Sequence, residues 1–334
     1  MSIQATPTRR APAATRTRTP GPPPAKPLLA LVLFPIIAVC VVWTFAWPTA
    51  RTAPHDLPIG VVGSATDTAA VRQRLAATGD AFAARAFPDE NAARKAIGDR
   101  EIYGAVVAGS GGTTVLTAPA ASPAVARLLT QVFAPAAGQT ATRSVVPLPR
   151  NDPNGAALPS LIVPLVLSGI VGGVLGLLMV RRLRQRLLVL VAGSAAAGLL
   201  CAALVQGWLE LLNGSQPANA GTLALTVLSI ASPLAGLSSL IGPRGIGMAA
   251  VVFAVAGNAF SGVASAPDLL PVPVGAIGAL LPPGAGVGLL RSTAYFDGAG
   301  ALGHLAVLVG WSLLGLVLLC VSAAKSRPAP VAQD

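Results

Sequence analysis

The stretch ALLPPGAGVGLLRSTAYF, residues 279–296, decides how this chain is arranged relative to a membrane. It is apolar enough to enter a bilayer, yet Pro282 and Pro283 and three alternating glycines interrupt it. Proline removes a backbone donor and clashes with the preceding helical turn, so a continuous helix through this point is disfavoured. The stretch could be a transmembrane helix, a phosphate-binding loop, or a segment that enters the membrane and leaves on the same side.

The composition is that of an integral membrane protein. Hydrophobic residues make up 53% of the 334 residues and charged residues only 10%, whereas an ordinary soluble domain has about 25% charged residues. A helix needs about 20 apolar residues to cross the hydrocarbon core. Six segments of suitable length predict membrane spans: 28–47, 158–180, 187–209, 221–241, 246–265 and 301–323. The fifth of them is slightly more polar than the others.

Basic residues near the ends of spans mark the cytoplasmic side of a membrane protein. With a cytoplasmic N-terminus, the cytoplasmic segments are 1–27, 181–186, 242–245 and 324–334. These segments carry 12 of the 23 Lys and Arg residues and a single acid, Asp334. The other 11 basic residues balance the other 11 acids, so the net charge of +11 lies on the predicted cytoplasmic face. The basicity therefore indicates membrane topology and no nucleic-acid partner.

The same charge count tests the opening stretch. If 271–290 crossed the membrane, the last helix would reverse and place Lys325 and Arg327 outside. The glycines of the stretch lack the lysine of a phosphate-binding loop, and they lie on the wrong side of the membrane for ATP. We therefore predict a polytopic α-helical membrane protein with six transmembrane helices and both termini in the cytoplasm. A re-entrant segment of irregular backbone, 270–290, precedes the sixth helix and opens to the outer face.

Residues 51–155, between the first two spans, are numerous enough for one small domain. Strand-like and helix-like runs alternate there, which predicts an extracytoplasmic α/β domain. The expected strands are 57–63, 82–87, 101–109, 112–119 and 142–149, and the expected helices are 67–79, 89–100 and 122–138. The tail 1–27 is rich in proline and arginine, which is typical of a disordered segment.

Catalytic chemistry is not evident in the sequence. No Walker A motif is present, and we predict no catalytic residue, cofactor or metal site. The predicted spans contain no Asp, Glu, Lys or Arg, and His304 is their only histidine. Ion-coupled carriers usually keep ionisable groups inside the membrane, so any transport would take its energy from another subunit. Gln206 and Asn258, both polar, either line a path or bond one helix to another.

Three stretches resemble a known family of membrane proteins. LPIGVVG (57–63) matches its hydrophobic strand at the start of the outside domain, and ENAARKAIGDREIYGAVVAG (90–109) matches a helix–strand unit. LLPPGAGVGLLRSTAYFDGAGALGHLAVLVGWSLLGLVLL (280–319) matches an ending with a proline break, an arginine, an aromatic pair and a tryptophan-containing span. Together with the layout over 47–323, they make the chain resemble the type-2 ABC exporter permeases, in particular the bacterial branch related to phage-infection protein.

The resemblance implies a permease subunit in the bacterial plasma membrane. Such a subunit pairs with a second copy or with a related permease and works with a separate cytoplasmic ATPase. It exports amphipathic or lipid-like substrates. One feature departs from the family, because the cytoplasmic loop where an ATPase docks is only Arg181 to Arg186. The alternative is therefore a membrane-anchored receptor or envelope scaffold whose α/β domain binds a partner.

Position in the sequence selects the candidate residues of a gate or pathway. Pro282, Pro283 and Gly284 are expected to break the re-entrant segment. Arg291, Tyr295 and Asp297 are expected at its outer mouth, where Arg291 either meets an anionic headgroup or anchors the segment at the interface.

Overall fold

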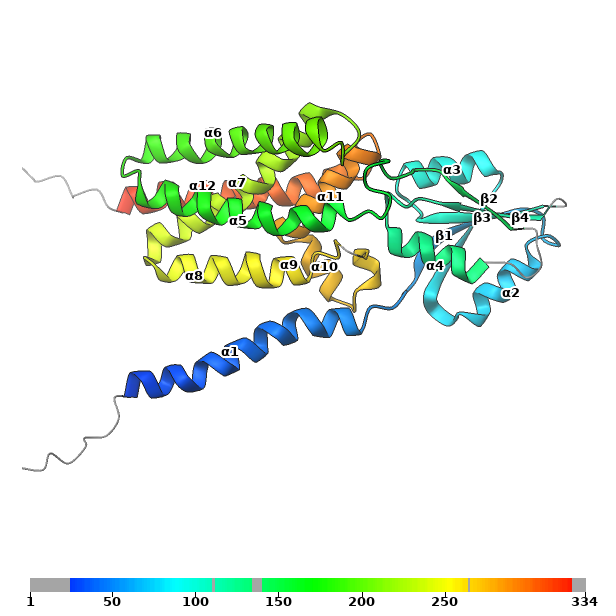
Figure 1. Cartoon of the computed structure of the whole chain (residues 1–334), viewed down its shortest axis with the longest axis horizontal. Coiled ribbons are helices and arrows are strands. Elements are labelled where there is room, and N and C mark those ends of the chain that lie inside the picture. Colours follow the sequence, from blue (N-terminus) through cyan, green and yellow to red (C-terminus); the bar gives the residue numbers. More distant parts are fainter. Residues whose placement is uncertain (1–24, 110–111, 134–139, 264, 326–334) are drawn as a thin grey trace, which may run out of the picture. The chain divides into compact units, whose positions relative to one another are not determined.

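The computed structural model describes residues 25–109, 112–133, 140–263 and 265–325 (Figure 1). The chain divides into two compact units, 1–42 and 43–334, and each is described by itself. The first unit contains most of α1 (Ala25–Ala50), a long apolar helix. The predicted tail 1–27 lies outside the described residues except for its last three, and so does the tail 324–334 except for its first two.

Among the described residues, five helices are long and apolar enough to cross a membrane. They comprise Leu29–Ala50 within α1, α5 (Ala157–Leu178), α6 (Leu183–Ala202) with a π-helical extension to Trp208, α7 (Gln216–Ile241) and α12 (Ala301–Lys325). The chain is therefore a multi-pass membrane protein with an α/β domain, as the sequence predicts. The structure does not establish the full set of six spans.

The predicted span 246–265 is shorter in the structure than in the sequence. Its helix consists of α8 (Arg244–Ala250), a π-helical stretch (Val251–Ala256) and α9 (Gly257–Ala259). At 1.5 Å per residue, these 16 residues extend about 24 Å, less than the roughly 30 Å of a hydrocarbon core. The helix ends because the chain turns at Gly262, whose φ of 61° lies in the left-handed region that favours glycine.

The opening stretch starts at the last residue of one short helix and, after a break, forms a second helix. α10 runs over Val274–Ala279 and α11 over Pro282–Tyr295. Pro282 and Pro283 occupy the first positions of α11, where proline is tolerated because those amides have no helical partner. The sequence-based expectation of irregular backbone through the glycines is therefore wrong, since they lie on a regular helix. They serve close packing, because a Cβ at Gly286 would lie 2.6 Å from Thr226 Cγ2 on α7.

α7 is the central helix of the bundle. It contacts α5, α6, α8, α11 and α12 (Figure 1), and it is the most buried of the candidate spans. Small residues allow its neighbours to approach closely. A Cβ at Gly236 of α7 would lie 2.6 Å from the carbonyl oxygen of Gly315 on α12. Such close backbone approach is typical of packing between membrane helices.

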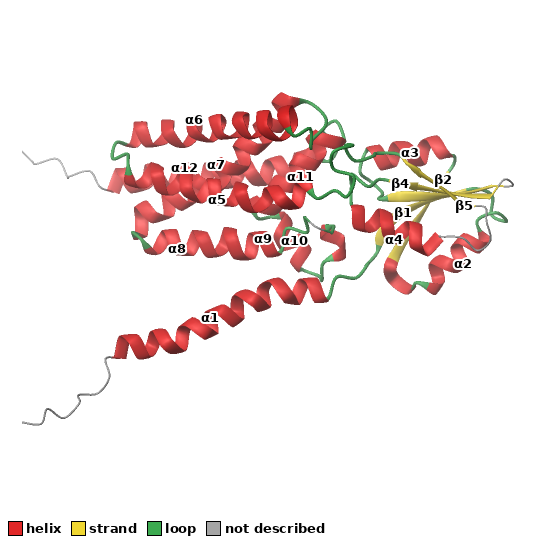
Figure 2. Ribbon diagram, in the orientation of Figure 1, coloured by secondary structure: helices red, strands yellow, loops and turns green. Residues whose placement is uncertain are grey.

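The α/β domain is built on a five-stranded sheet in the order β2-β1-β3-β4-β5 (Figure 2). The strands are β1 (Leu57–Val62), β2 (Phe82–Phe87), β3 (Gly104–Gly109), β4 (Gly112–Thr117) and β5 (Thr140–Ser144). Only β3 and β4 pair antiparallel, and the other neighbours are parallel. Helices α2 (Ala69–Ala77) and α4 (Pro123–Phe133) cover one face, and α3 (Glu90–Gly98) covers the other (Figure 1).

Residues far along the chain complete both cores of this domain. The cluster under α2 and α4 includes Ala266 and Leu269, which come from the 3₁₀ turn Pro267–Leu269 and the residue before it. The cluster under α3 includes Phe296, which directly follows α11. The sequence places the domain at 51–155, whereas its cores also take in both flanks of the α10–α11 segment.

Candidate functional site at the junction of the α/β domain and α11

The α10–α11 segment is attached to the α/β domain at both of its ends. Before α10, Ser122 Oγ donates a hydrogen bond of 2.6 Å to the carbonyl of Ser265, and the amide of Ala53 donates one of 3.1 Å to the carbonyl of Leu269. After α11, Phe296 is only 5% exposed in the core under α3. A movement of the α/β domain would therefore be transmitted to both ends of the segment.

Arg100 links the α/β domain to the middle of α11. Its Nη1 donates to the carbonyl of Gly288, at 3.2 Å, and to Ser292 Oγ. Its guanidinium carbon lies 5.4 Å from the ring centre of Phe296, which is within the range of a cation–π contact. Burial lowers the pKa of the guanidinium. These contacts join residues 188 and 192 positions apart in the sequence.

The backbone of Arg100 is itself unusual. The amide of Glu101 donates to the carbonyl of Ala96 and that of Arg100 to the carbonyl of Ile97, which is the Schellman pattern at the end of α3. The left-handed position of this motif is usually glycine, but here Arg100 occupies it with φ of 63°. A non-glycine residue in this region costs on the order of 1 kcal/mol or more. The contacts of the side chain with α11 offset that cost.

Tyr103 makes a second polar link across the junction. Its hydroxyl donates a hydrogen bond of 2.6 Å to Asp268 Oδ2. Burial, and after it the negative charge of Asp268, raises the pKa of the phenol. A cavity of about 330 Å³ lies at this place. It is lined by Pro58, Arg100, Ile102, Tyr103, Ala121, Pro267, Asp268, Ala279, Gly300 and His304.

Arg291 lies in the interior and not at the exposed mouth that its position in the sequence suggests. Its side chain is 4% exposed, because α11 is covered by the α/β domain on one side and by the bundle on the other. Nη2 donates a long hydrogen bond of 3.4 Å to the carbonyl of Val263, and Nε has no partner. Arg291 also lines a very small space beside Tyr295 and Asp152.

The other candidate residues lie apart from one another. Pro282, Pro283 and Gly284 are buried at the start of α11. Tyr295 donates a hydrogen bond of 3.3 Å to the carbonyl of Leu211. Asp297 is exposed in the turn before α12.

Gln206 belongs to a polar network between helices. Asn219 is fully buried on α7. It donates a hydrogen bond of 2.9 Å to Gln206 Oε1 and accepts one of 2.8 Å from Thr293 Oγ1 of α11. Gln206 in turn donates a hydrogen bond of 2.8 Å to the carbonyl of Gly214. The network therefore joins helices, and Gln206 also lines a surface pocket of about 530 Å³ beside Asn213 and Gly214. Asn258 lies half-buried on α9, outside this network.

The most important residues of the junction, Arg100, Tyr103 and Asp268, are not apparent in the sequence. Arg100 follows the end of α3 and Asp268 lies in a short 3₁₀ turn, where charged residues are ordinary surface features. Their partners are 165 to 192 positions away. Only the structure reveals that Arg100 occupies the left-handed position after α3 that is usually glycine.

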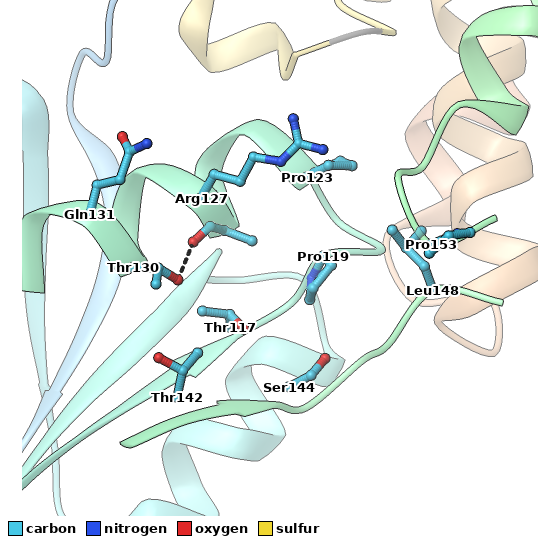
Figure 3. A pocket seen from close by; sticks show the side chains of 11 residues that line it. Thr117, Pro119, Pro123, Arg127, Thr130, Gln131, Thr142, Ser144, Leu148 and Pro153 are labelled. Atoms are coloured by element: carbon cyan, nitrogen blue, oxygen red, sulfur yellow. Dashed lines mark hydrogen bonds between the residues drawn. The ribbon is translucent and has the colours of Figure 1, made fainter. Parts of the chain in front are cut away.

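A separate groove lies on the α/β domain between α4 and the edge strand β5 (Figure 3). It measures about 560 Å³ and is more open than the junction cavity. Figure 3 shows hydroxyl side chains on the sheet side of the groove and Arg127 and Gln131 on the helix side. Its lining is Thr117, Pro119, Pro123, Ala126, Arg127, Thr130, Gln131, Thr142, Ser144, Leu148 and Pro153.

Among the residues that the structure describes, no group of three or more His, Cys, Asp or Glu side chains could hold a metal ion. Comparison of the chain with protein-family models, with curated proteins and with solved structures found no match.

Proposed function

We propose that this protein is the membrane-spanning permease subunit of an ABC-type exporter, which moves an amphipathic or lipid-like substrate outward with a separate ATPase. One observation supports it most directly. The α/β domain holds both ends of the α10–α11 segment, and this segment packs on the central helix α7. Movement of the bundle during a transport cycle and movement of the α/β domain would therefore be coupled.

The proposal includes a specific topology. Residues 244–259 form the fifth crossing, short enough to need a locally thinned bilayer or a packed partner. The α/β domain then lies outside and both termini lie in the cytoplasm of a bacterium, in agreement with the basic residues near the span ends. The break between α10 and α11 lies near the outer surface as part of an exit gate. Many large apolar side chains of the spans are exposed, which suits lipid and a second permease subunit.

Purification from the native host tests the proposal. The full chain, solubilised in mild detergent and captured by an affinity tag, is expected to bring with it a subunit that hydrolyses ATP. Deletion of the gene is expected to raise the cellular content of an amphipathic compound or to deplete a lipid of the outer surface. Absence of a co-purifying ATPase, together with unchanged efflux and envelope lipids, would contradict the proposal.

The groove of Figure 3 favours a second candidate function, that of a receptor or scaffold. Its volume and its hydroxyl, amide and guanidinium groups suit a polar partner of the α/β domain. Crosslinking from a photoreactive amino acid placed at Gln131 would capture such a partner in the intact membrane. A specific partner, lost in Arg127→Glu and retained in Arg85→Glu on the opposite edge strand, would favour this function over export.

A further inference from the structure

We propose that the cavity between the α/β domain and α10–α12 is an oxyanion site that takes a phosphate group, with Arg100 as its main ligand and Arg291 as a second positive charge nearby. The site is independent of the proposed transport function, because binding does not require an ATPase. Nothing in the local sequence marks it, since Arg100 and Arg291 come from different domains.

The cavity has room and suitable groups. Its volume of about 330 Å³ far exceeds the roughly 30 Å³ that one water molecule occupies in the liquid. Within the described chain, Arg100 donates hydrogen bonds only through Nη1, which leaves Nε and Nη2 for a ligand. A planar guanidinium donates in a fixed fork that matches the oxygens of a phosphate. His304 also lines the cavity, and its ring lies against α11 at Gly288.

The positive charges at the junction are not neutralised by ion pairs. In the described part of the chain, neither Arg100 nor Arg291 has a carboxylate oxygen within 4.0 Å, and the ion pairs present join other residues. Arg291 does not line the cavity itself but the small neighbouring space beside Tyr295 and Asp152, so it adds positive charge near the site without contacting a ligand there. Arg291 is almost fully buried, and its Nε has no hydrogen-bond partner. Burial of an unpaired charge is costly, and a bound anion would reduce that cost.

Two carboxylates lie near the site, and both have other partners. Asp268 lines the cavity but accepts the hydroxyl of Tyr103 and is exposed to solvent. Asp152 lines the small space beside Arg291, and it accepts the amides of Ala156 and Ala157 at the start of α5, at 2.7 and 3.0 Å. The positive end of that helix already stabilises its charge. The charge of Asp268 does act on Arg100, but no carboxylate oxygen of the described chain lies within 4.0 Å of either guanidinium, so Nε and Nη2 of Arg100 keep no protein acceptor.

A phosphate group could come from a lipid headgroup or from free inorganic phosphate. Binding of inorganic phosphate is measured by calorimetric titration of the full chain in a zwitterionic detergent at constant ionic strength. Lipid binding is measured by native mass spectrometry after exchange into micelles with phosphatidylglycerol or, for comparison, with an uncharged glycolipid. Saturable binding of inorganic phosphate or selective retention of phosphatidylglycerol supports the site, and which of the two is seen identifies the source.

The variant Arg100→Gln is expected to weaken phosphate binding by about tenfold or more, because it removes the charge and the fork of donors. Arg85→Gln, on the exposed edge strand β2, is the matched control and is expected to bind like the wild type. Arg100→Lys keeps the charge and is expected to bind with intermediate affinity. The proposal is overturned if wild-type protein binds neither inorganic phosphate nor phosphatidylglycerol, or if folded Arg100→Gln binds them as tightly as wild type does.

Discussion

Gly198 on α6 gives a sharp test of how the bundle is held together. A Cβ at this position would lie 2.5 Å from the carbonyl oxygen of Ala220 and from the amide nitrogen of Ala224, and 2.6 Å from Ala224 Cβ. Ordinary van der Waals contact begins at 3.4 Å, so Gly198→Ala requires α6 and α7 to separate by about 0.9 Å (3.4 − 2.5) at their crossing. Because two of the three atoms are backbone, no change of rotamer relieves the clash.

The expected loss of stability follows from that separation. Overpacking of a tight core costs about 1–3 kcal/mol, and a gap of 0.5–1 Å forfeits a quarter to a half of each dispersion contact along the seam. We therefore expect Gly198→Ala to lower the free energy of unfolding by about 3 kcal/mol. Gly193 is on the same helix, and a Cβ there would meet nothing within 4 Å. Gly193→Ala is expected to be neutral or to stabilise by up to about 1 kcal/mol, because alanine favours the helix.

The measurement is unfolding of the detergent-solubilised protein by sodium dodecyl sulfate, followed by circular dichroism, for the wild type and both variants. The difference between Gly198→Ala and Gly193→Ala isolates the packing term, since both make the same chemical change on one helix. A difference below about 0.5 kcal/mol would refute the close crossing of α6 and α7.

Three further predictions concern other parts of the chain. Asp89→Ala is expected to lower the unfolding free energy of the α/β domain by about 1 kcal/mol, because Asp89 accepts a hydrogen bond from the amide of Ala92 at the start of α3. Chemical denaturation measures this loss, and an unchanged denaturation midpoint would contradict the prediction. Asp152→Ala leaves two amides at the start of α5 without acceptors and is expected to lower the unfolding free energy by about 1–3 kcal/mol. Faster amide hydrogen exchange at Ala156 and Ala157 is the expected signature, and unchanged exchange there would disprove the cap. The double variant with Pro282→Ala and Pro283→Ala is expected to insert and fold, with a change of only about 1 kcal/mol in unfolding free energy, because both prolines are at the start of α11. An efflux assay is expected to show impaired export, and normal efflux would remove the gating role of the break.

The membrane spans and the α/β domain could be predicted because their causes are local. A spanning helix must satisfy its backbone within itself, so length and hydropathy suffice to find α5, α6, α7 and α12. Strand and helix runs likewise alternate in the sequence of the α/β domain. The end of the fifth helix was predicted wrongly, because apolar composition continues to residue 265 while the backbone turns at Gly262.

The polar junction could not be predicted, because its causes are not local. Prolines at 282 and 283 indicate a break, but the same residues break a helix or begin one, depending on which side of them the helix lies. The glycines that follow resemble a flexible loop in sequence, yet their use is to bring α11 close to α7 and to the ring of His304. Only the position of the neighbouring helices distinguishes these uses.

The arginines show the limit of charge counting. Counting Lys and Arg residues assigns sides of the membrane well, because most of these side chains are near water. Arg291 enters that count as an exposed charge, but it is only 4% exposed, and Pro119 and Leu148 of the α/β domain line the small space beside it. A covered arginine no longer indicates the side of the membrane. Its buried charge must instead be compensated within the junction, or it lowers the stability of the fold. A bound oxyanion beside Arg100 would meet this constraint without any further change in the fold.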